Sequence, residues 1–133
     1  GDISEQNKKR WQFNPEQGRY YSKKWQEIPS NRLTVLLRCR VHQAKVKSIP
    51  CDVEALRRFI ANPPLDCALC SVAIDYTYGS GKLQRGPSLD RIVNARGYVD
   101  GNIALLCSRC NRIKGEASAF EHRRIADFIE QHS

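Results

Sequence analysis

Two Cys-x-x-Cys pairs constrain the fold of this chain more than any other feature of its sequence. Cys67 and Cys70 form the first pair, Cys107 and Cys110 form the second, and residues 71–106 lie between them. Each pair can direct two thiolates at one ion, and two pairs complete the tetrahedral four-cysteine shell that structural zinc prefers. We therefore predict a structural zinc site, against the alternatives of two unrelated cysteine pairs or disulfides between them. A closed shell leaves no position for water, so this ion should stabilise the fold rather than perform chemistry.

Two further cysteines lie outside these pairs. Cys39, His42 and Cys51 would supply three ligands for a second metal site, but the sequence offers no fourth ligand. We expect Cys39 and Cys51 to be small buried residues instead.

The charge of the chain favours a polyanionic partner. Its 133 residues suit one compact domain, and 22 Lys and Arg against 14 Asp and Glu leave a formal charge of +8. Nucleic acid fits this excess better than an anionic membrane surface.

No stretch approaches the roughly 20 apolar residues that span a bilayer, and the N-terminus lacks the apolar core of a signal peptide. We therefore expect a cytoplasmic protein without a membrane partner, in which cysteines bind metal more readily than they form disulfides.

The chain divides into a predicted N-terminal arm, residues 1–29, and a single predicted domain, residues 30–133. In the arm, lysines and arginines alternate with tryptophans and tyrosines. This composition suits an arm that follows a nucleic-acid backbone and stacks on its bases. The alternative is an arm whose aromatic side chains pack on the domain.

The domain should begin with two helices. Ser30 is the expected N-cap of the first helix, which Pro50 ends, and Asp52 is the expected cap of the second, which ends at residues 62–64 (Asn-Pro-Pro). After Pro64 the sequence indicates short β-rich pieces separated by glycines, with a flexible loop over residues 78–82.

A third long helix is predicted near the C-terminus. Ser118-Ala119-Phe120-Glu121 has the form of a capping box, and the side chains that should make its buried stripe are those of Ile125, Phe128 and Ile129. Helices, a small hairpin region and a final helix together predict an α+β fold.

Between the cysteine pairs, the sequence predicts a hairpin that leads into a helix. Residues 88–92 and residues 103–106 alternate like two strands, and a helix can continue from Asn111. This order would bring Asp90 of the first strand close to Asn111. Two oxygen ligands with several waters are a common way to hold Mg²⁺. The structural alternative is an aspartate that caps a turn and an asparagine that caps a helix.

The motifs S-L-D-R-I, G-Y-x-x-G-N and L-C-x-x-C-N-x-x-K resemble those of the HNH (ββα-metal) endonucleases, in particular the small zinc-containing enzymes of phages. The motif match covers residues 67–115, with a looser match back to about residue 30. The resemblance implies N-terminal helices, a zinc-stapled ββα-metal (His-Me finger) motif and a C-terminal helix. It also implies an endonuclease that hydrolyses phosphodiester bonds of DNA with Mg²⁺ or Mn²⁺, in the host cytoplasm if a phage encodes it.

The resemblance also implies residue roles. Asp90 and Asn111 would be the ligands of the catalytic cation, and Asn102 would tie the loop together and help to orient the base. Arg91 stands where the family has its general-base histidine. An arginine stays protonated and is a poor base, although it can hold a phosphate and stabilise the charge of the transition state.

Three explanations for Arg91 compete. The cation itself could lower the pKa of the attacking water. A histidine from elsewhere could act as the base, and His122 is more plausible than His42 or His132. Alternatively, the site is weak or inactive, and the chain is a zinc-stabilised nucleic-acid-binding accessory protein. We favour the active enzyme. A protein–protein module with a solvated basic face is a weaker third hypothesis.

Basic residues surround the predicted hairpin and should contact phosphates. They are Lys82, Arg85, Arg91, Arg96, Arg109, Arg112 and Lys114. DNA binding should therefore weaken steeply with salt. In the enzymes that the chain resembles, the helix of the motif lies against the minor groove, so backbone contacts should dominate. The pattern predicts neither a recognition sequence nor a small-molecule ligand.

Overall fold

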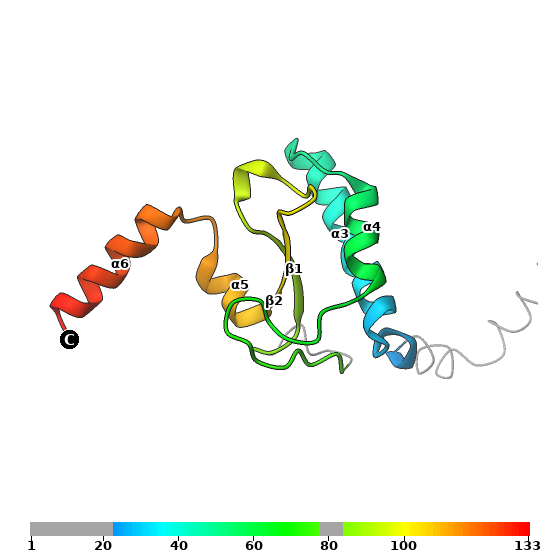
Figure 1. The fold of residues 1–133 in the computed structure, drawn as a ribbon, viewed down its shortest axis with the longest axis horizontal. Coiled ribbons are helices and arrows are strands. Elements are labelled where there is room, and N and C mark those ends of the chain that lie inside the picture. Colours follow the sequence, from blue (N-terminus) through cyan, green and yellow to red (C-terminus); the bar gives the residue numbers. More distant parts are fainter. Residues whose placement is uncertain (1–22, 78–83) are drawn as a thin grey trace, which may run out of the picture.

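The protein has an α+β fold, as the sequence predicts (Figure 1). The structure is a computed structural model that describes residues 23–77 and 84–133, so most of the predicted arm and the loop that contains Lys82 lie outside the described residues. The elements are α3 (Pro29–Lys47), α4 (Val53–Ala61), β1 (Pro87–Arg91), the 3₁₀ turn η2 (Asn94–Arg96), β2 (Ile103–Cys107), α5 (Ser108–Lys114) and α6 (Ala119–Gln131).

Most helix boundaries follow local capping signals. Asp52 accepts hydrogen bonds from two backbone N–H groups of α4, at 3.1 and 3.3 Å. Ser118 forms the predicted capping box of α6. The prediction that Ser30 caps the first helix is wrong, because α3 begins at Pro29 with Ile28 in the N-cap position. Proline suits the first helical position, since its φ is already helical and it has no N–H to satisfy.

In the part of the chain that the structure describes, the sheet consists of two antiparallel strands. Ser88 lies opposite Leu106, and Asp90 lies opposite Ala104. Both strands agree with the predicted hairpin to within a residue at each end. These two strands are among the short β-rich pieces expected after Pro64. Between Pro64 and β1, an isolated bridge in the described residues joins Asp66 to Ala73.

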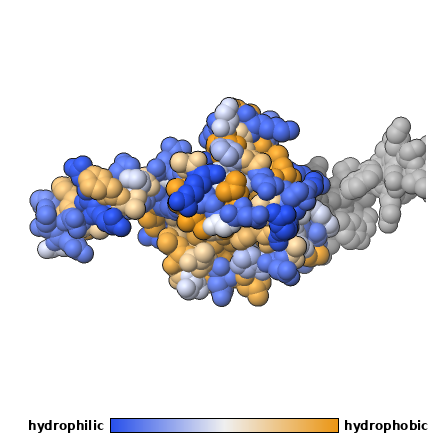
Figure 2. All heavy atoms as spheres, turned by 45° about the horizontal axis from the view of Figure 1, so that its top comes forward, coloured by the Kyte–Doolittle hydropathy of each residue, from blue (hydrophilic) through white to orange (hydrophobic). Residues whose placement is uncertain are grey.

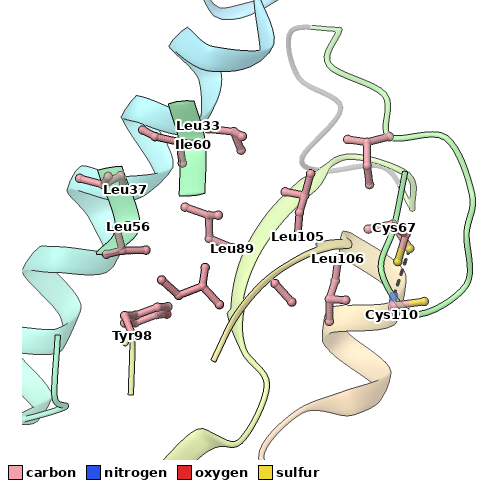
Figure 3. Close-up of a cluster of buried hydrophobic side chains, with 14 of the residues drawn as sticks. Leu33, Leu37, Leu56, Ile60, Cys67, Leu89, Tyr98, Leu105, Leu106 and Cys110 are labelled. Atoms are coloured by element: carbon pink, nitrogen blue, oxygen red, sulfur yellow. Dashed lines mark hydrogen bonds between the residues drawn. The ribbon is translucent and has the colours of Figure 1, made fainter. Parts of the chain in front are cut away.

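The core lies between the helices and one face of this hairpin. Figure 1 shows α3 and α4 on one side of the strands and α5 on the other. Leu33 and Leu56 are fully buried against the sheet, where Leu89 and Leu105 are also buried. In Figure 3, Cys67 and Cys110 lie beyond Leu105, on the side away from α3. The cysteines therefore extend the core past the sheet.

The loop between the strands pairs with the connection between α3 and α4. The backbone N–H of Tyr98 donates to the carbonyl of Pro50 at 2.9 Å, and the N–H of Asp52 donates to the carbonyl of Tyr98 at 2.8 Å. A Cβ on Gly97 would lie 2.1 Å from that Pro50 oxygen. Only glycine permits this close approach, which holds the loop against the helical layer.

The helix α6 does not bury the predicted stripe. Figure 1 shows it projecting away from the rest of the molecule. Ile125, Phe128 and Ile129 are 51, 64 and 56% exposed. In Figure 2, the surface of the projecting helix α6 carries hydrophobic residues beside hydrophilic ones. The prediction of burial is wrong, because the short link after α5 directs α6 away from the core. None of the described helices, α6 included, has the length and apolarity that crossing a membrane requires.

Candidate metal centre and active-site pocket

The four cysteines of the two pairs come together as one cluster. Their sulfur atoms all lie within 4.8 Å of one another, and Cys70 Sγ is 3.9 Å from Cys107 Sγ. Tetrahedral zinc with Zn–S bonds of about 2.3 Å places its sulfurs about 3.8 Å apart. All four thiols are free of disulfides, so the cluster can hold a metal ion such as zinc.

Backbone hydrogen bonds shape both knuckles. In the second pair, Cys107 Sγ accepts from the N–H of Cys110 at 3.4 Å. In the first pair, the N–H of Ser71 closes the turn onto the carbonyl of Cys67 at 2.9 Å. The N–H of Ala68 donates to the carbonyl of Leu105 at 3.0 Å. This last bond attaches the first knuckle to β2, which leads into the second knuckle.

The thiols of the cluster have unequal acidity. Burial opposes ionisation of Cys67, but hydrogen bonds from nearby backbone N–H groups outweigh it and lower the pKa of that thiol to about 6. Burial and the neighbouring cysteines raise the pKa of Cys110. A second thiolate would be repelled by the first, so a cation is needed before all four sulfurs ionise.

Cys39 and Cys51 do not form a second cluster within the described residues. Cys39 is exposed on α3, so the prediction that it is buried is wrong. Cys51 is partly buried, and its backbone pairs with Tyr98. The helix turns Cys39 outward because the buried face of α3 runs through Leu33 and Leu37.

Asp90 and Asn111 line the same pocket, as the predicted hairpin and helix required. The cavity measures about 200 Å³ and lies between α3 and α5 along β1. Its lining residues are Arg40, Gln43, Lys47, Ile49, Leu89, Asp90, Arg91, Asn94, Tyr98, Asn111, Gly115 and Glu116. The amide of Asn111 donates to Ser88 Oγ at 2.7 Å, which fixes its side chain beside β1. Carboxylate and amide oxygens of this kind are suitable ligands for Mg²⁺.

An ammonium group already contacts the carboxylate of this pocket. Lys114 Nζ lies 3.0 Å from Asp90 Oδ2, and the two side chains are only 21 and 12% exposed. The same ammonium donates to the carbonyl of Arg91 at 2.8 Å and to Asn94 Oδ1 at 3.2 Å. Lys114 was predicted to contact phosphates, but the structure turns it inward, where it balances the buried charge of Asp90.

Arg91 lies at the end of β1 beside Asp90. Its Nη1 donates to the carbonyl of Asn94 at 3.0 Å, and its Cζ lies 5.7 Å from the centre of the Tyr98 ring. These contacts hold the guanidinium on the wall of the pocket.

Asn102 is buried and ties the hairpin loop together, in agreement with the predicted loop role. Its amide donates to the carbonyls of Val93 and Gly97 at 3.0 and 2.7 Å, and its oxygen accepts from the N–H of Val93 at 2.9 Å. Asn94 lies within this loop, so Asn102 helps to position both acceptors of that residue: its backbone carbonyl, which accepts from Arg91, and its Oδ1, which accepts from Lys114. Asn102 itself is not part of the pocket lining.

No histidine lines the pocket in the described part of the chain. His122 Nε2 donates to the carbonyl of Lys114 at 2.8 Å, so this ring supports the junction between α5 and α6. His42 and His132 are exposed. The second carboxylate of the pocket is Glu116, which the sequence did not single out.

Four of the arginines predicted to contact DNA are exposed. They are Arg85, Arg96, Arg109 and Arg112. Each remains available for phosphates. Trp25, the tryptophan of the predicted arm that the structure describes, is 44% exposed rather than packed into the core.

Sequence reasoning missed the contribution of α3 to the pocket. Arg40, Gln43 and Lys47 lie on one face of that helix, at the spacing i, i+3, i+7. Arg40 continues the stripe of Leu33 and Leu37, both buried. A charged residue in an apolar stripe was the signal that could have indicated a site there.

Comparison of the chain with family models, with curated proteins and with solved structures finds no match.

Proposed function

We propose that this protein is a divalent-metal-dependent endonuclease that hydrolyses phosphodiester bonds of DNA, with zinc held by its four paired cysteines. One observation carries the proposal: Asp90 from β1 and Asn111 from α5 line a single pocket that also contains Arg40, Lys47 and Arg91. Oxygen ligands for a cation beside basic groups for an anion are what metal-assisted phosphodiester hydrolysis requires.

The proposed roles follow from the contacts in the pocket. Asp90 and Asn111 would hold Mg²⁺ or Mn²⁺, which when bound supplies positive charge and lowers the pKa of the attacking water. Arg91 would bind the phosphate and stabilise its developing charge. Lys114 balances Asp90 in the free protein and has to share that carboxylate with the cation.

The proton of the attacking water needs an acceptor. The pocket contains the exposed carboxylate of Glu116 and no histidine among its described lining residues. Glu116 is therefore a candidate base in addition to His122, which contacts the carbonyl of Lys114 instead. Replacing each by glutamine would distinguish them through the pH dependence of cleavage.

DNA is the expected partner, through its phosphate backbone. The formal charge of +8 and the exposed arginines around the hairpin support this partner. Affinity should fall linearly in a plot of log K against log salt concentration.

Cleavage of supercoiled plasmid in Mg²⁺ or Mn²⁺ tests the proposal. We expect Asp90→Asn to lower the rate by about a hundredfold or more, because charge stabilisation in a transition state is of that size. Asp100→Asn is the matched control, since Asp100 is exposed and pairs with Arg58 outside the pocket. Equal rates for the two variants, or no cutting by the wild type with any divalent cation, would reject the enzyme.

A second candidate is a zinc-stabilised nucleic-acid-binding accessory protein with a weak or inactive site. The observation that favours it is the ammonium of Lys114, which already contacts Asp90, the Arg91 carbonyl and Asn94. Under this hypothesis, DNA binding occurs without cutting, and Asp90→Asn leaves the affinity unchanged.

A further inference from the structure

Two arginines of the pocket lack acidic partners. Arg40 of α3 and Arg91 of β1 both line the cavity, and neither forms an ion pair with any residue that the structure describes. The Nε atom of each is buried without a hydrogen-bond partner in the same described part of the chain. Two guanidiniums beside one cavity without a carboxylate partner leave positive charge uncompensated, so the pair points to an anionic group that enters the pocket.

Neutral groups orient both guanidiniums without balancing their charge. Arg40 donates to Gln43 Oε1 at 2.9 Å and to Ser88 Oγ at 3.4 Å. Arg91 donates to the carbonyl of Asn94 at 3.0 Å. Ser88 also receives the amide of Asn111, so Arg40 is linked to the proposed cation ligand through one hydroxyl.

Tyr98 lines the cavity together with the two arginines. Arg91 Cζ lies 5.7 Å from the centre of the Tyr98 ring. Burial raises the pKa of the Tyr98 phenol, and the positive charges of Arg40 and Arg91 oppose that rise. The cavity beside them measures about 200 Å³. Since one water occupies about 30 Å³, this space accommodates a phosphate group with several waters.

We propose that Arg40 and Arg91 form a phosphate-binding subsite next to Asp90. A guanidinium presents a planar fork of donors that matches phosphate oxygens. The inference deepens the proposed function, on which it rests, by assigning a phosphate contact to a residue of α3, far from the hairpin in sequence. The phosphate belongs either to the backbone of a nucleic acid or to a free ion, and both present the same tetrahedral oxygens.

The test compares Arg40→Met with Arg38→Met. Both substitutions remove one positive charge from α3, but Arg38 is exposed and does not line the pocket. Fluorescence anisotropy with a labelled DNA duplex, over a series of salt concentrations and without added divalent cation, measures the affinity for DNA. Calorimetric titration with inorganic phosphate measures the affinity for the free ion.

We expect Arg40→Met to weaken binding by about ten- to a hundredfold, the size of a lost charge-assisted hydrogen bond. For DNA, the slope of log K against log salt should decrease in magnitude by about 0.9. Arg38→Met should weaken binding by less than about threefold and leave the slope unchanged. An effect on phosphate but not on DNA would identify the free ion as the source.

The unfolding temperature of the Arg40 variant distinguishes a binding role of this arginine from a structural one. Because Arg40 has a buried donor without an acceptor, Arg40→Met should unfold at the same temperature as the wild type or a higher one. Arg40→Lys keeps the charge but loses the fork, so its binding should weaken several-fold.

Equal affinities of Arg40→Met and Arg38→Met for both DNA and inorganic phosphate would overturn the subsite. So would an Arg40→Lys variant that binds like the wild type together with an Arg40→Met variant that is unfolded. Because binding is measured without divalent cations, a protein that never cuts DNA can still pass this test.

Discussion

Gly97 and Gly101 share a backbone feature but have different surroundings. Their φ values are +77° and +80°, which L side chains rarely adopt. A Cβ on Gly97 would lie 2.1 Å from the carbonyl oxygen of Pro50, whereas a Cβ on Gly101 would meet nothing within 4 Å. Gly101 therefore serves the turn alone, while Gly97 also lets the hairpin loop approach the helical layer.

Alanine at these two positions should separate the two effects. Gly101→Ala should lower the free energy of unfolding by about 1 kcal/mol, the strain of a left-handed conformation. Gly97→Ala should lower it by about 3 kcal/mol or more, since the backbone of Pro50 also has to move. Urea unfolding measures both, and equal losses would mean that the close approach to Pro50 contributes nothing to stability.

At the scale of elements, α6 shows how a local pattern can be correct in type and wrong in its packing. The capping box of Ser118 and the helix that follows agree with the sequence. The apolar stripe, however, has no surface of the described chain to cover it. Periodicity predicts which side chains share a face, but the burial of that face depends on the direction in which the preceding link sends the helix.

Isoleucine-to-alanine substitutions compare α6 with α4. Ile60 near the end of α4 is 8% exposed, and Ile129 near the end of α6 is 56% exposed. Ile60→Ala should lower the free energy of unfolding by about 2–5 kcal/mol, and Ile129→Ala by less than about 0.5 kcal/mol. The readout is the midpoint of thermal or urea unfolding. A large loss at Ile129 would contradict the exposed placement of α6.

At the scale of the whole molecule, the cysteine cluster joins segments that are far apart in sequence. The first pair lies in the loop after Pro64, whereas the second lies where β2 passes into α5. Several of these cysteines are part of the core itself. In the described residues the sheet has two strands, and a two-stranded hairpin alone is marginally stable. We therefore expect a metal bound by the cluster to hold the loop and α5 to the sheet.

Removal of the metal should therefore affect the whole fold. Apparent binding free energies of structural zinc reach about 10 kcal/mol, comparable with the total stability of about 5–15 kcal/mol of a typical domain. We expect a chelator or Cys67→Ser to abolish cooperative thermal unfolding, followed by circular dichroism, and elemental analysis to find one zinc per wild-type chain. The control is Cys39→Ser, because Cys39 is exposed and outside the cluster. Loss of stability in the control, or a wild type without metal, would contradict this role.

Features of the fold that depend on neighbouring residues were predictable from the amino-acid sequence. The capping of α4 and α6 and the two strands follow from interactions within a few positions of the chain. The cysteine cluster was also predictable, although its two pairs are far apart in sequence. One structural zinc ion binds four thiolates, and two Cys-x-x-Cys pairs supply that number.

The contacts between distant side chains were visible only in the tertiary structure. It placed Arg40 in the pocket, turned Lys114 onto Asp90 and left the stripe of α6 exposed. The physical reason is that burial and charge pairing depend on which elements pack together, and each residue's own neighbours in sequence carry little information about that packing. Asp90 could therefore be singled out from its sequence motif. Its neighbours Lys114 and Arg40 could be identified only from the packing of α5 and α3 on either side of β1.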